Sequence, residues 1–285
     1  MTTELTQKIQ RLLDQQVRET FPLSVGSTGT VYKARLDDGL QLVAKVDQFE
    51  PERLDIEAWM LGYLREASQL PVPEVILCAD GLLLLEFIQG ESRFSTRAEE
   101  HAAELLAALH NIPGPTYGFE ADTLIGSLPQ PNPPTGSWVD FFGEHRLHFM
   151  ANEAYKAGRL PKKLIKSIDA LCNDLDRWLI DSNPPGLIHG DAWTGNILCV
   201  EDRITGFIDP AVYYADPEIE LAFTTLFGTF GKPFFDRYQE IRPLNPGFFE
   251  ERKAIYNLYP LLVHVRLFGG SYVNSVAQTL SSFGY

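Results

Sequence analysis

The feature that most constrains this chain is a polar block enclosed by short apolar runs in its second half. Residues 188–196 read IHGDAWTGN, and the triplet IDP follows at residues 208–210. Four residues separate Asp191 from Asn196, and an apolar stretch with the composition of short strands lies between Asn196 and Asp209. The block therefore places two carboxylates and one amide in loops that short strands enclose.

These three side chains are the types that phosphoryl transfer requires. The reaction needs a carboxylate that accepts the proton of the attacking hydroxyl, and oxygen ligands that hold Mg²⁺ against the phosphates of ATP. The order and spacing are typical of a kinase catalytic loop and metal site, with Asp191 as the candidate base and Asn196 and Asp209 as candidate Mg²⁺ ligands. The alternative is structural, a buried Asp and Asn that hydrogen-bond a turn between two strands. The complete block at this spacing favours the catalytic interpretation.

Length and charge limit the classes of protein to consider. The chain has 285 residues and 45% hydrophobic content, which fits one large or two smaller globular lobes. Its 38 acidic and 24 basic residues give a net charge of −14. Nucleic acids and anionic membrane surfaces require a basic face, so we expect neither as a partner. A phosphate site in so acidic a chain has to be built locally.

The cysteines and the N-terminus indicate a cytoplasmic protein. The three cysteines are widely spaced and form no CxxC pair, so neither a zinc site nor a disulfide framework is expected. The first residues lack the charged-then-apolar pattern of a signal peptide. No apolar run approaches the roughly 20 residues that span a bilayer. Without a coiled-coil pattern or other assembly signal, we expect a monomer.

The first part of the chain predicts a small antiparallel sheet crossed by a helix. Apolar residues recur at helical spacing from Leu5 to Val17, and a second helix is expected to begin at Pro51. Strands are expected at residues 30–34, 41–46, 74–78 and 82–88. This pattern ends near residue 90 and predicts an N-terminal nucleotide-binding lobe over residues 1–90.

The remainder, residues 91–285, predicts a larger and mainly helical catalytic lobe, so the fold class is α+β with two lobes. Thr96 and Glu99 form a capping-box pattern before a helix that runs to His110. Further helices are expected over residues 138–156 and 161–181 and in the C-terminal third. Residues 113–136 are rich in proline and glycine, and a loop of this length is usually functional.

A glycine-bearing turn is the first candidate for binding ATP. It consists of Gly26, Ser27, Thr28 and Gly29. Glycine lets the backbone approach phosphates closely and donate its N–H groups. The pattern is a degenerate form of a glycine-rich loop, and taken alone it fits a plain hairpin turn better.

Lys45 and Glu57 form a second candidate, and the segment Glu86-Phe87-Ile88 a third. A cation flanked by apolar residues needs a partner when it is buried, and Glu57 on the following helix could supply one for Lys45. The pair would then orient the α and β phosphates. The alternative is an ordinary lysine on an edge strand. Glu86, Phe87 and Ile88 end an apolar strand where the lobes would join, a hinge position at which a kinase-like fold contacts adenine.

Two further residues lie inside the polar block. His189 is expected to shape the loop by packing and hydrogen bonding, although a role as the base is an alternative. Trp193 could stack on a sugar or aliphatic face of a substrate, or it could cap the core.

With these motifs the chain resembles the fructosamine-3-kinase (ketosamine-3-kinase) family, within the aminoglycoside phosphotransferase and protein-kinase-like fold. Trp193 in the loop and the sequence DPAVYY at residues 209–214 carry most of the resemblance. Residues 125–147 look like the insertion in the C-terminal lobe of that family, and residues 267–272 look like its C-terminal segment. Glu220 departs from the family pattern, because relatives usually have Asp there.

The resemblance implies ATP-dependent phosphorylation of the sugar 3-hydroxyl of ketosamines, with ATP and Mg²⁺ as cofactors. The acceptors would be small ketosamines or glycated proteins, and decomposition of the product would free the amine. Trp193 and Tyr272 would line the substrate groove. Two alternatives stay open: a kinase of another small molecule, such as an aminoglycoside or choline, and a nucleotide-binding scaffold without turnover. The presence of Lys45, Asp191 and Asp209 disfavours the scaffold.

Overall fold

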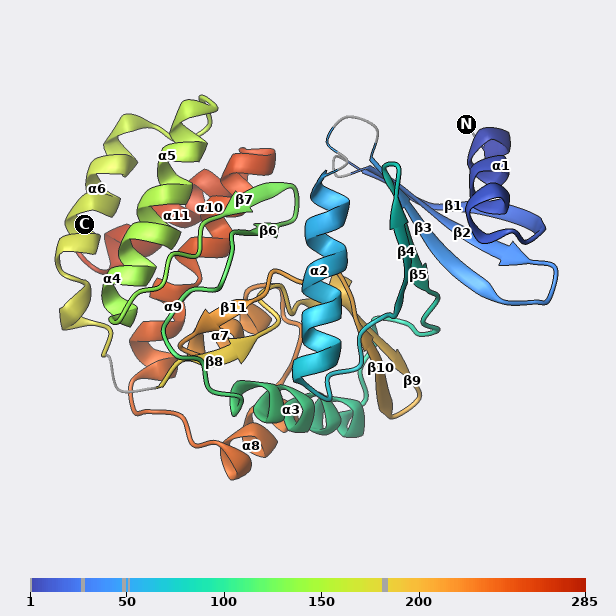
Figure 1. Ribbon diagram of the computed structural model, residues 1–285. Coiled ribbons are helices and arrows are strands. Elements are labelled where there is room, and N and C mark those ends of the chain that lie inside the picture. Colours follow the sequence, from blue (N-terminus) through green and yellow to red (C-terminus); the bar gives the residue numbers. More distant parts are fainter. Residues whose placement is uncertain (1, 27–28, 48–49, 51, 181–183) are drawn as a thin grey trace.

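The N-terminal part of the computed structural model is an antiparallel sheet of five strands in the order β1-β2-β3-β5-β4 (Figure 1). The structure describes residues 2–26, 29–47, 50, 52–180 and 184–285. The strands of the sheet are β1 (Val17–Gly26), β2 (Gly29–Leu36), β3 (Gln41–Val46), β4 (Val75–Ala79) and β5 (Leu82–Glu86). Of the predicted glycine-bearing turn, Gly26 and Gly29 pair at the ends of β1 and β2, while Ser27 and Thr28 lie outside the described residues.

Helices cover both faces of this sheet. Helix α1 (Thr2–Leu13) packs through Leu5 and Ile9 on one face, and α2 (Glu52–Ala67) lies on the other, between the sheet and the helical lobe (Figure 1). The prediction that the first helix reaches Val17 is wrong. Asp14 takes a left-handed φ of 53°, a conformation that ends helices, and Val17 begins a strand that was not predicted.

The alternation of β3 decides where Lys45 points. Leu42 and Ala44 belong to the small core beneath α1, whereas Val43 packs on the large core that α2 shares. Side chains two residues apart lie on the same face of a strand, so Lys45 faces α2 together with Val43. Because β3 lies between β2 and β5, the alternative of an ordinary edge-strand lysine is wrong.

The rest of the described chain is mainly helical, with three short two-stranded antiparallel pairs inserted, as the α+β prediction requires. Its helices are α3 (Thr96–His110), α4 (Trp138–Phe142), α5 (Phe149–Lys156), α6 (Lys162–Asn173), α7 (Glu218–Leu226), α8 (Lys232–Ile241), α9 (Lys253–Tyr256), α10 (Leu258–Phe268) and α11 (Ser271–Ser282). Its strands are β6 (Thr123–Ile125), β7 (Leu128–Gln130), β8 (Gly186–Ile188), β9 (Ile197–Val200), β10 (Arg203–Phe207) and β11 (Tyr213–Ala215). The predicted lobe boundary near residue 90 stays a prediction.

Two helix ends differ from the sequence prediction. The N-cap of α3 is Ser95, whose hydroxyl accepts a hydrogen bond from the Ala98 N–H, rather than Thr96. The helix predicted over residues 161–181 ends at Asn173. Asp174 leaves the helical conformation, and its carboxylate accepts a hydrogen bond from the Tyr285 hydroxyl (3.0 Å).

The proline-rich stretch at residues 113–136 contains a small hairpin that reaches toward the N-terminal sheet. Its strands β6 and β7 pair antiparallel, and β6 contacts α2 (Figure 1). Gly126 occupies the turn with a φ of 58°, a left-handed value that glycine adopts without strain. A segment of the helical part therefore lies beside the helix that carries Glu57. Within the described ranges, no helix is long and apolar enough to cross a membrane.

Candidate active site

The loop after β8 holds Asp191 and Asn196 in contact. The Asn196 Nδ2 donates to the Asp191 carboxylate (2.6 Å) and to the Asp191 carbonyl oxygen (3.0 Å). This leaves the Asn196 Oδ1 without a hydrogen bond to any described residue, so that oxygen is available to a ligand. The amide group thus fixes the carboxylate with one end and offers an acceptor at the other.

The second carboxylate comes to this place because the segment after β10 pairs with the loop. The Ile208 N–H donates to the Asn196 carbonyl (2.9 Å), and the Ala211 N–H donates to the His189 carbonyl (2.8 Å). Between these bonds Asp209 takes a left-handed φ of 55°, and its side chain is 48% exposed. Gly190 permits the close approach, since a Cβ there would lie 2.0 Å from the Ala211 carbonyl oxygen.

Lys45 connects the sheet to this loop. Its ammonium contacts the Glu57 Oε1 at 2.5 Å and also forms an ion pair with Asp209. Burial alone would lower the pKa of Lys45, but the carboxylates of Asp209 and Glu57 outweigh that effect and raise the pKa above its ordinary value. Lys45 is therefore a permanent cation, and it brings together the three residues that the sequence predicted from separate motifs.

Asp191 is held in a form suited to proton transfer. Desolvation by the surrounding protein raises the pKa of Asp191 to about 8, and the nearby charge of Asp209 adds to the rise. Hydrogen bonds from the side chains of Asn196 and Trp193 act in the opposite direction. A general base works best with a pKa near the operating pH.

The raised pKa of Asp191 predicts that Asp191→Asn stabilises the protein free of nucleotide and metal. An unfolded Asp has a pKa near 4, so the wild type loses stability as the pH rises from about 4 to 8, because the folded state resists ionisation. The Asn variant lacks this loss. We expect it to be more stable at pH 8 by about 1–3 kcal/mol, a value reduced for partial exposure, and nearly equal to wild type at pH 4. Urea unfolding across this pH range measures the difference; a gap that shrinks as the pH rises would contradict the prediction.

The Glu220 carboxylate holds the catalytic loop through hydrogen bonds, a role that the sequence did not predict. One carboxylate oxygen accepts the Gly190 N–H (2.6 Å), and the other accepts the His189 N–H (3.1 Å) and contacts the His110 Nε2 (2.9 Å). Burial alone would raise the pKa of Glu220, but these donors, His110 foremost, hold it below its usual value. An acidic residue in the apolar run of α7 was the available signal.

His189 shapes the loop from the inside. Its ring is fully buried, packs against Phe207 with the ring centroids 5.7 Å apart, and accepts the Asp191 N–H at Nδ1 (3.3 Å). Desolvation lowers the pKa of His189, so the imidazole is neutral at pH 7. The ring does not line the cavity beside Asp191.

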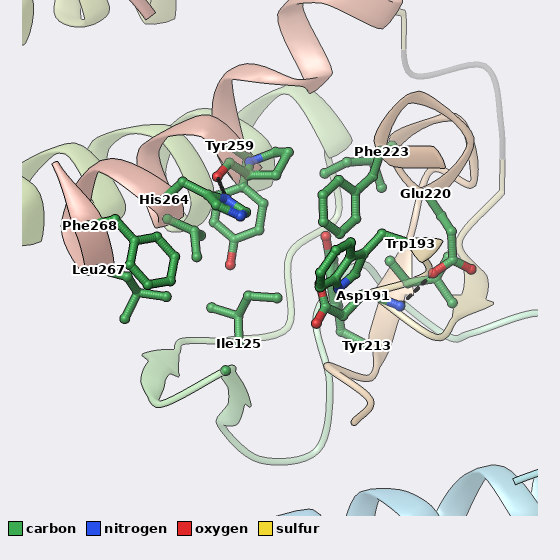
Figure 2. Close-up of a pocket in the computed structure, with 16 residues that line it drawn as sticks. Ile125, Asp191, Trp193, Tyr213, Glu220, Phe223, Tyr259, His264, Leu267 and Phe268 are labelled. Carbon is green, nitrogen blue, oxygen red and sulfur yellow. Dashed lines mark hydrogen bonds between the residues drawn. The ribbon is translucent and has the colours of Figure 1, made fainter. Parts of the chain in front are cut away.

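A cavity of about 150 Å³ opens beside Asp191 (Figure 2). We call it the Asp191 cavity. Most of its wall is apolar or aromatic, and it draws on the catalytic loop, the β6–β7 hairpin, α7 and α10. The residues labelled in Figure 2 are Ile125, Asp191, Trp193, Tyr213, Glu220, Phe223, Tyr259, His264, Leu267 and Phe268. Of the two carboxylates in this lining, Glu220 is bonded to His110 and to the N–H groups of His189 and Gly190, so Asp191 is the one suited to a neutral hydroxyl as its partner.

The two residues predicted to contact substrate lie differently. Trp193 lines the Asp191 cavity and packs against Phe227 with the ring centroids 5.5 Å apart. Tyr272 lies behind the wall, where its ring packs on His264 (4.8 Å between centroids) and Phe268 (6.4 Å). Direct contact between Tyr272 and a substrate stays a prediction.

A second cavity, of about 130 Å³, lies on the other side of the β6–β7 hairpin. We call it the Lys45 cavity. It opens between β2, β3, α2 and the Asp209 segment. Its charged lining residues are Lys45, Asp47, Arg53, Glu57 and Asp209. The predicted nucleotide-binding residues Lys45 and Glu57 and the predicted metal ligand Asp209 therefore share one cavity.

The predicted hinge segment leads out of the N-terminal sheet. Glu86 ends β5, and the Phe87 N–H donates to the Gln41 carbonyl (3.3 Å). Ile88 packs so closely on β10 that a Cβ at Gly206 would lie 2.6 Å from the Ile88 Cδ1. The segment thus spans from the sheet to the β9–β10 hairpin, and its contact with adenine stays a prediction.

Comparison with known proteins decides the family. The family model described as fructosamine kinase matches residues 1–283. The chain belongs to the fructosamine kinase family. A protein named as a probable ketoamine kinase, from Synechocystis sp., is 42% identical over 239 residues, which cover 81% of this chain and 77% of that protein. A protein-ribulosamine 3-kinase of Oryza sativa is 32% identical, covering 82% of this chain and 68% of its own length.

Solved structures agree with this membership. The structure of a candidate fructosamine-3-kinase from Thermobifida fusca superposes with a TM-score of 0.86 and 30% identity, covering 99% of both chains. An ADP-bound aminoglycoside phosphotransferase matches at a TM-score of 0.65 with 16% identity, which is a likeness of fold alone. The predicted protein-kinase-like fold with two lobes is confirmed. As a family member with this fold, the protein is an ATP-dependent phosphotransferase.

Proposed function

We propose that this fructosamine kinase family member is a ketosamine 3-kinase, which transfers the γ-phosphoryl group of ATP to the sugar 3-hydroxyl of a glycated amine. The observation that carries the proposal is the placement of Asp191, which lies at the floor of a largely apolar cavity and is fixed by Asn196 at 2.6 Å. The names of the relatives, a probable ketoamine kinase and a protein-ribulosamine 3-kinase, support this acceptor class.

Asp191 would accept the proton of the attacking hydroxyl. The Asn196 amide holds one carboxylate oxygen, and the carboxylate lines the Asp191 cavity, where it would face the acceptor. Orientation of this kind contributes by keeping the reacting atoms in place, and the raised pKa of Asp191 gives the carboxylate an affinity for the proton that it takes up.

The residues present fit a bound Mg²⁺. The Asn196 Oδ1 has no hydrogen bond to a described residue, and the exposed Asp209 carboxylate lies on the segment whose backbone pairs with Asn196. Mg²⁺ prefers such oxygen ligands and commonly binds through one or two carboxylates together with phosphate oxygens. When bound, the metal would neutralise charge on the phosphates. Lys45, held by Glu57, would bind the phosphates from the side of the sheet.

The acceptor would lie in the Asp191 cavity. Trp193 and Tyr259 offer aromatic faces for the aliphatic side of a sugar, and the cavity opens past Phe268, which is 60% exposed. An amine substituent could extend through that opening, so either a small glycated amine or a glycated lysine on a protein fits. Decomposition of the phosphorylated product would release the amine, which makes the proposed role deglycation.

The decisive experiment is Mg²⁺-ATP turnover on ribulose-lysine and fructose-lysine, with the phosphorylated sugar detected by mass spectrometry. We expect product with the wild type, and a rate reduced by at least about a hundredfold in Asp191→Asn, because removal of a general base costs this much or more. If ATP is consumed with an aminoglycoside or choline as acceptor but neither ketosamine is phosphorylated, the substrate assignment is wrong.

A further inference from the structure

The tip of the β6–β7 hairpin lies where the two cavities meet. One cavity holds Asp191, and the other holds Lys45 and Asp209. Among the residues that the structure describes, Gly126 is the one that lines both, and its neighbour Ser127 lines the Lys45 cavity. A group that passes from the Lys45 cavity to a hydroxyl beside Asp191 therefore passes this turn.

The turn carries polar groups that form no hydrogen bond with any described residue. Ile125 pairs with Leu128, so Gly126 and Ser127 form a two-residue hairpin loop, with the left-handed residue in the first position. No described residue accepts a hydrogen bond from the N–H of Gly126 or Ser127, nor bonds to the Ser127 hydroxyl. Ser127 is nevertheless only 9% exposed. Gly126 is exposed and both residues line the Lys45 cavity, so these three unpaired donors are accessible to a ligand in that cavity.

The hairpin is held rigidly against the loop that follows Asp209. The Gln130 Nε2 donates to the Ala211 carbonyl (3.1 Å) and to the Thr123 Oγ1 (2.9 Å), which joins β7 to β6 and to that loop. The Tyr259 hydroxyl in turn donates to the Gln130 Oε1 (2.7 Å). These bonds anchor the hairpin that carries the turn, and donors positioned before a ligand binds stabilise developing charge without having to reorganise.

A second residue that supports the hairpin, Arg146, lies deeper in the protein. Arg146 is fully buried, donates to the Asn132 Oδ1 (2.6 Å), and lies 3.9 Å above the centroid of the Tyr213 ring. Asn132 donates to the Thr123 Oγ1 (2.8 Å), so the chain of contacts ends on β6. The turn is thus the tip of a hairpin that contacts with buried side chains hold in place.

The charged residues that line the Lys45 cavity are mostly acidic, so binding of a phosphoryl group would also require uncharged donors. Its two cations, Lys45 and Arg53, are opposed by three carboxylates, and Lys45 is already paired with Glu57 and Asp209. A phosphoryl group carries negative charge on three oxygens, so uncharged N–H and O–H donors at the turn would complete its binding.

We propose that the Gly126-Ser127 turn binds the phosphoryl group during transfer, through the Ser127 hydroxyl and the two free N–H groups. This rests on the proposed function, which locates the nucleotide in the Lys45 cavity. The bond from the γ-phosphorus to the oxygen of ADP breaks, the bond to the acceptor oxygen forms, and the acceptor proton goes to Asp191. Ser127 donates a hydrogen bond only and is not modified, so it acts as a catalytic residue by electrostatic stabilisation.

The test uses binding measurements that do not depend on the identity of the acceptor. Affinities for Mg²⁺-ADP and for Mg²⁺-ADP with aluminium fluoride, an analogue of the transferred group, are measured by calorimetry for wild type, Ser127→Ala and Ser127→Thr. In Ser127→Ala we expect the affinity for the fluoride complex to fall about tenfold to a hundredfold, while the affinity for ADP stays unchanged. Ser127→Thr keeps the hydroxyl and should recover most of the loss.

Slow hydrolysis of ATP by water, without any acceptor, gives a second measurement. It should fall in Ser127→Ala by a factor similar to the loss in fluoride-complex affinity. Equal affinities of wild type and Ser127→Ala for the fluoride complex would overturn the proposal, as would an equal loss for ADP alone, which would indicate an effect on nucleotide binding. A wild type that binds the fluoride complex but phosphorylates no ketosamine would instead contradict the proposed substrate.

Discussion

Replacement of Asp209 by Asn is expected to reduce turnover by about a thousandfold or more, the largest effect of any single substitution at this site. A catalytic metal contributes several kcal/mol of transition-state stabilisation, and each 1.4 kcal/mol changes the rate about tenfold. Asn keeps the size of the side chain and tolerates the left-handed backbone that Asp209 adopts at a φ of 55°. The substitution therefore removes the charge that would bind Mg²⁺ and leaves the local fold in place.

Asp80 provides a matched control for this experiment. It is also an aspartate with a left-handed φ, of 53°, but it lies exposed in the β4–β5 turn. Asp80→Asn should retain full activity. Turnover measured against Mg²⁺ concentration, with nucleotide affinity in the presence and absence of the metal, separates loss of metal from loss of fold. Near-normal turnover of Asp209→Asn at low Mg²⁺ would remove Asp209 from the metal site.

The site residues that could be predicted lie close together in the sequence or on consecutive elements of the chain. Asp191 and Asn196 lie in one loop, and the distance along the chain to Asp209 is short enough for a single β-hairpin, so their spacing alone implied a common site. Lys45 and Glu57 could be predicted as a pair because a strand and the next helix are neighbours in the fold.

The contacts that the sequence did not predict join residues that lie far apart in the chain. No motif or short spacing connects such residues in the sequence. Glu220 reaches Gly190 over 30 positions in the sequence and His110 over 110. The β6–β7 hairpin was predicted only as a functional loop, because strands of three residues are too short to show an alternating pattern. Its position between the two cavities depends on buried side chains such as Gln130, whose partners only the three-dimensional structure reveals.

Glu220→Gln is expected to lower the free energy of unfolding by about 2–4 kcal/mol and to reduce turnover as well. The carboxylate accepts hydrogen bonds from two backbone N–H groups of the catalytic loop and from His110, all in a buried environment. In Gln one acceptor oxygen becomes an NH₂ donor, which leaves a buried N–H facing another donor, and loss of a hydrogen bond to a charged group costs about 1.5–3 kcal/mol. Urea unfolding at pH 7.5 measures the change in stability.

The companion variant Glu220→Asp tests whether the loop needs the longer side chain of Glu at this position. A carboxylate one methylene shorter cannot keep the 2.6 Å contact with Gly190 and the 2.9 Å contact with His110 unless α7 moves toward the loop. We expect it to lose less stability than Glu220→Gln, because both oxygens remain acceptors.

Glu99→Gln is the control, since Glu99 also accepts a backbone N–H, from Gly231 (2.8 Å), but at the surface. If Glu220→Gln and Glu99→Gln had equal effects, burial would not explain the importance of Glu220, and the loop would have to be held mainly by the pairing of Ala211 with His189.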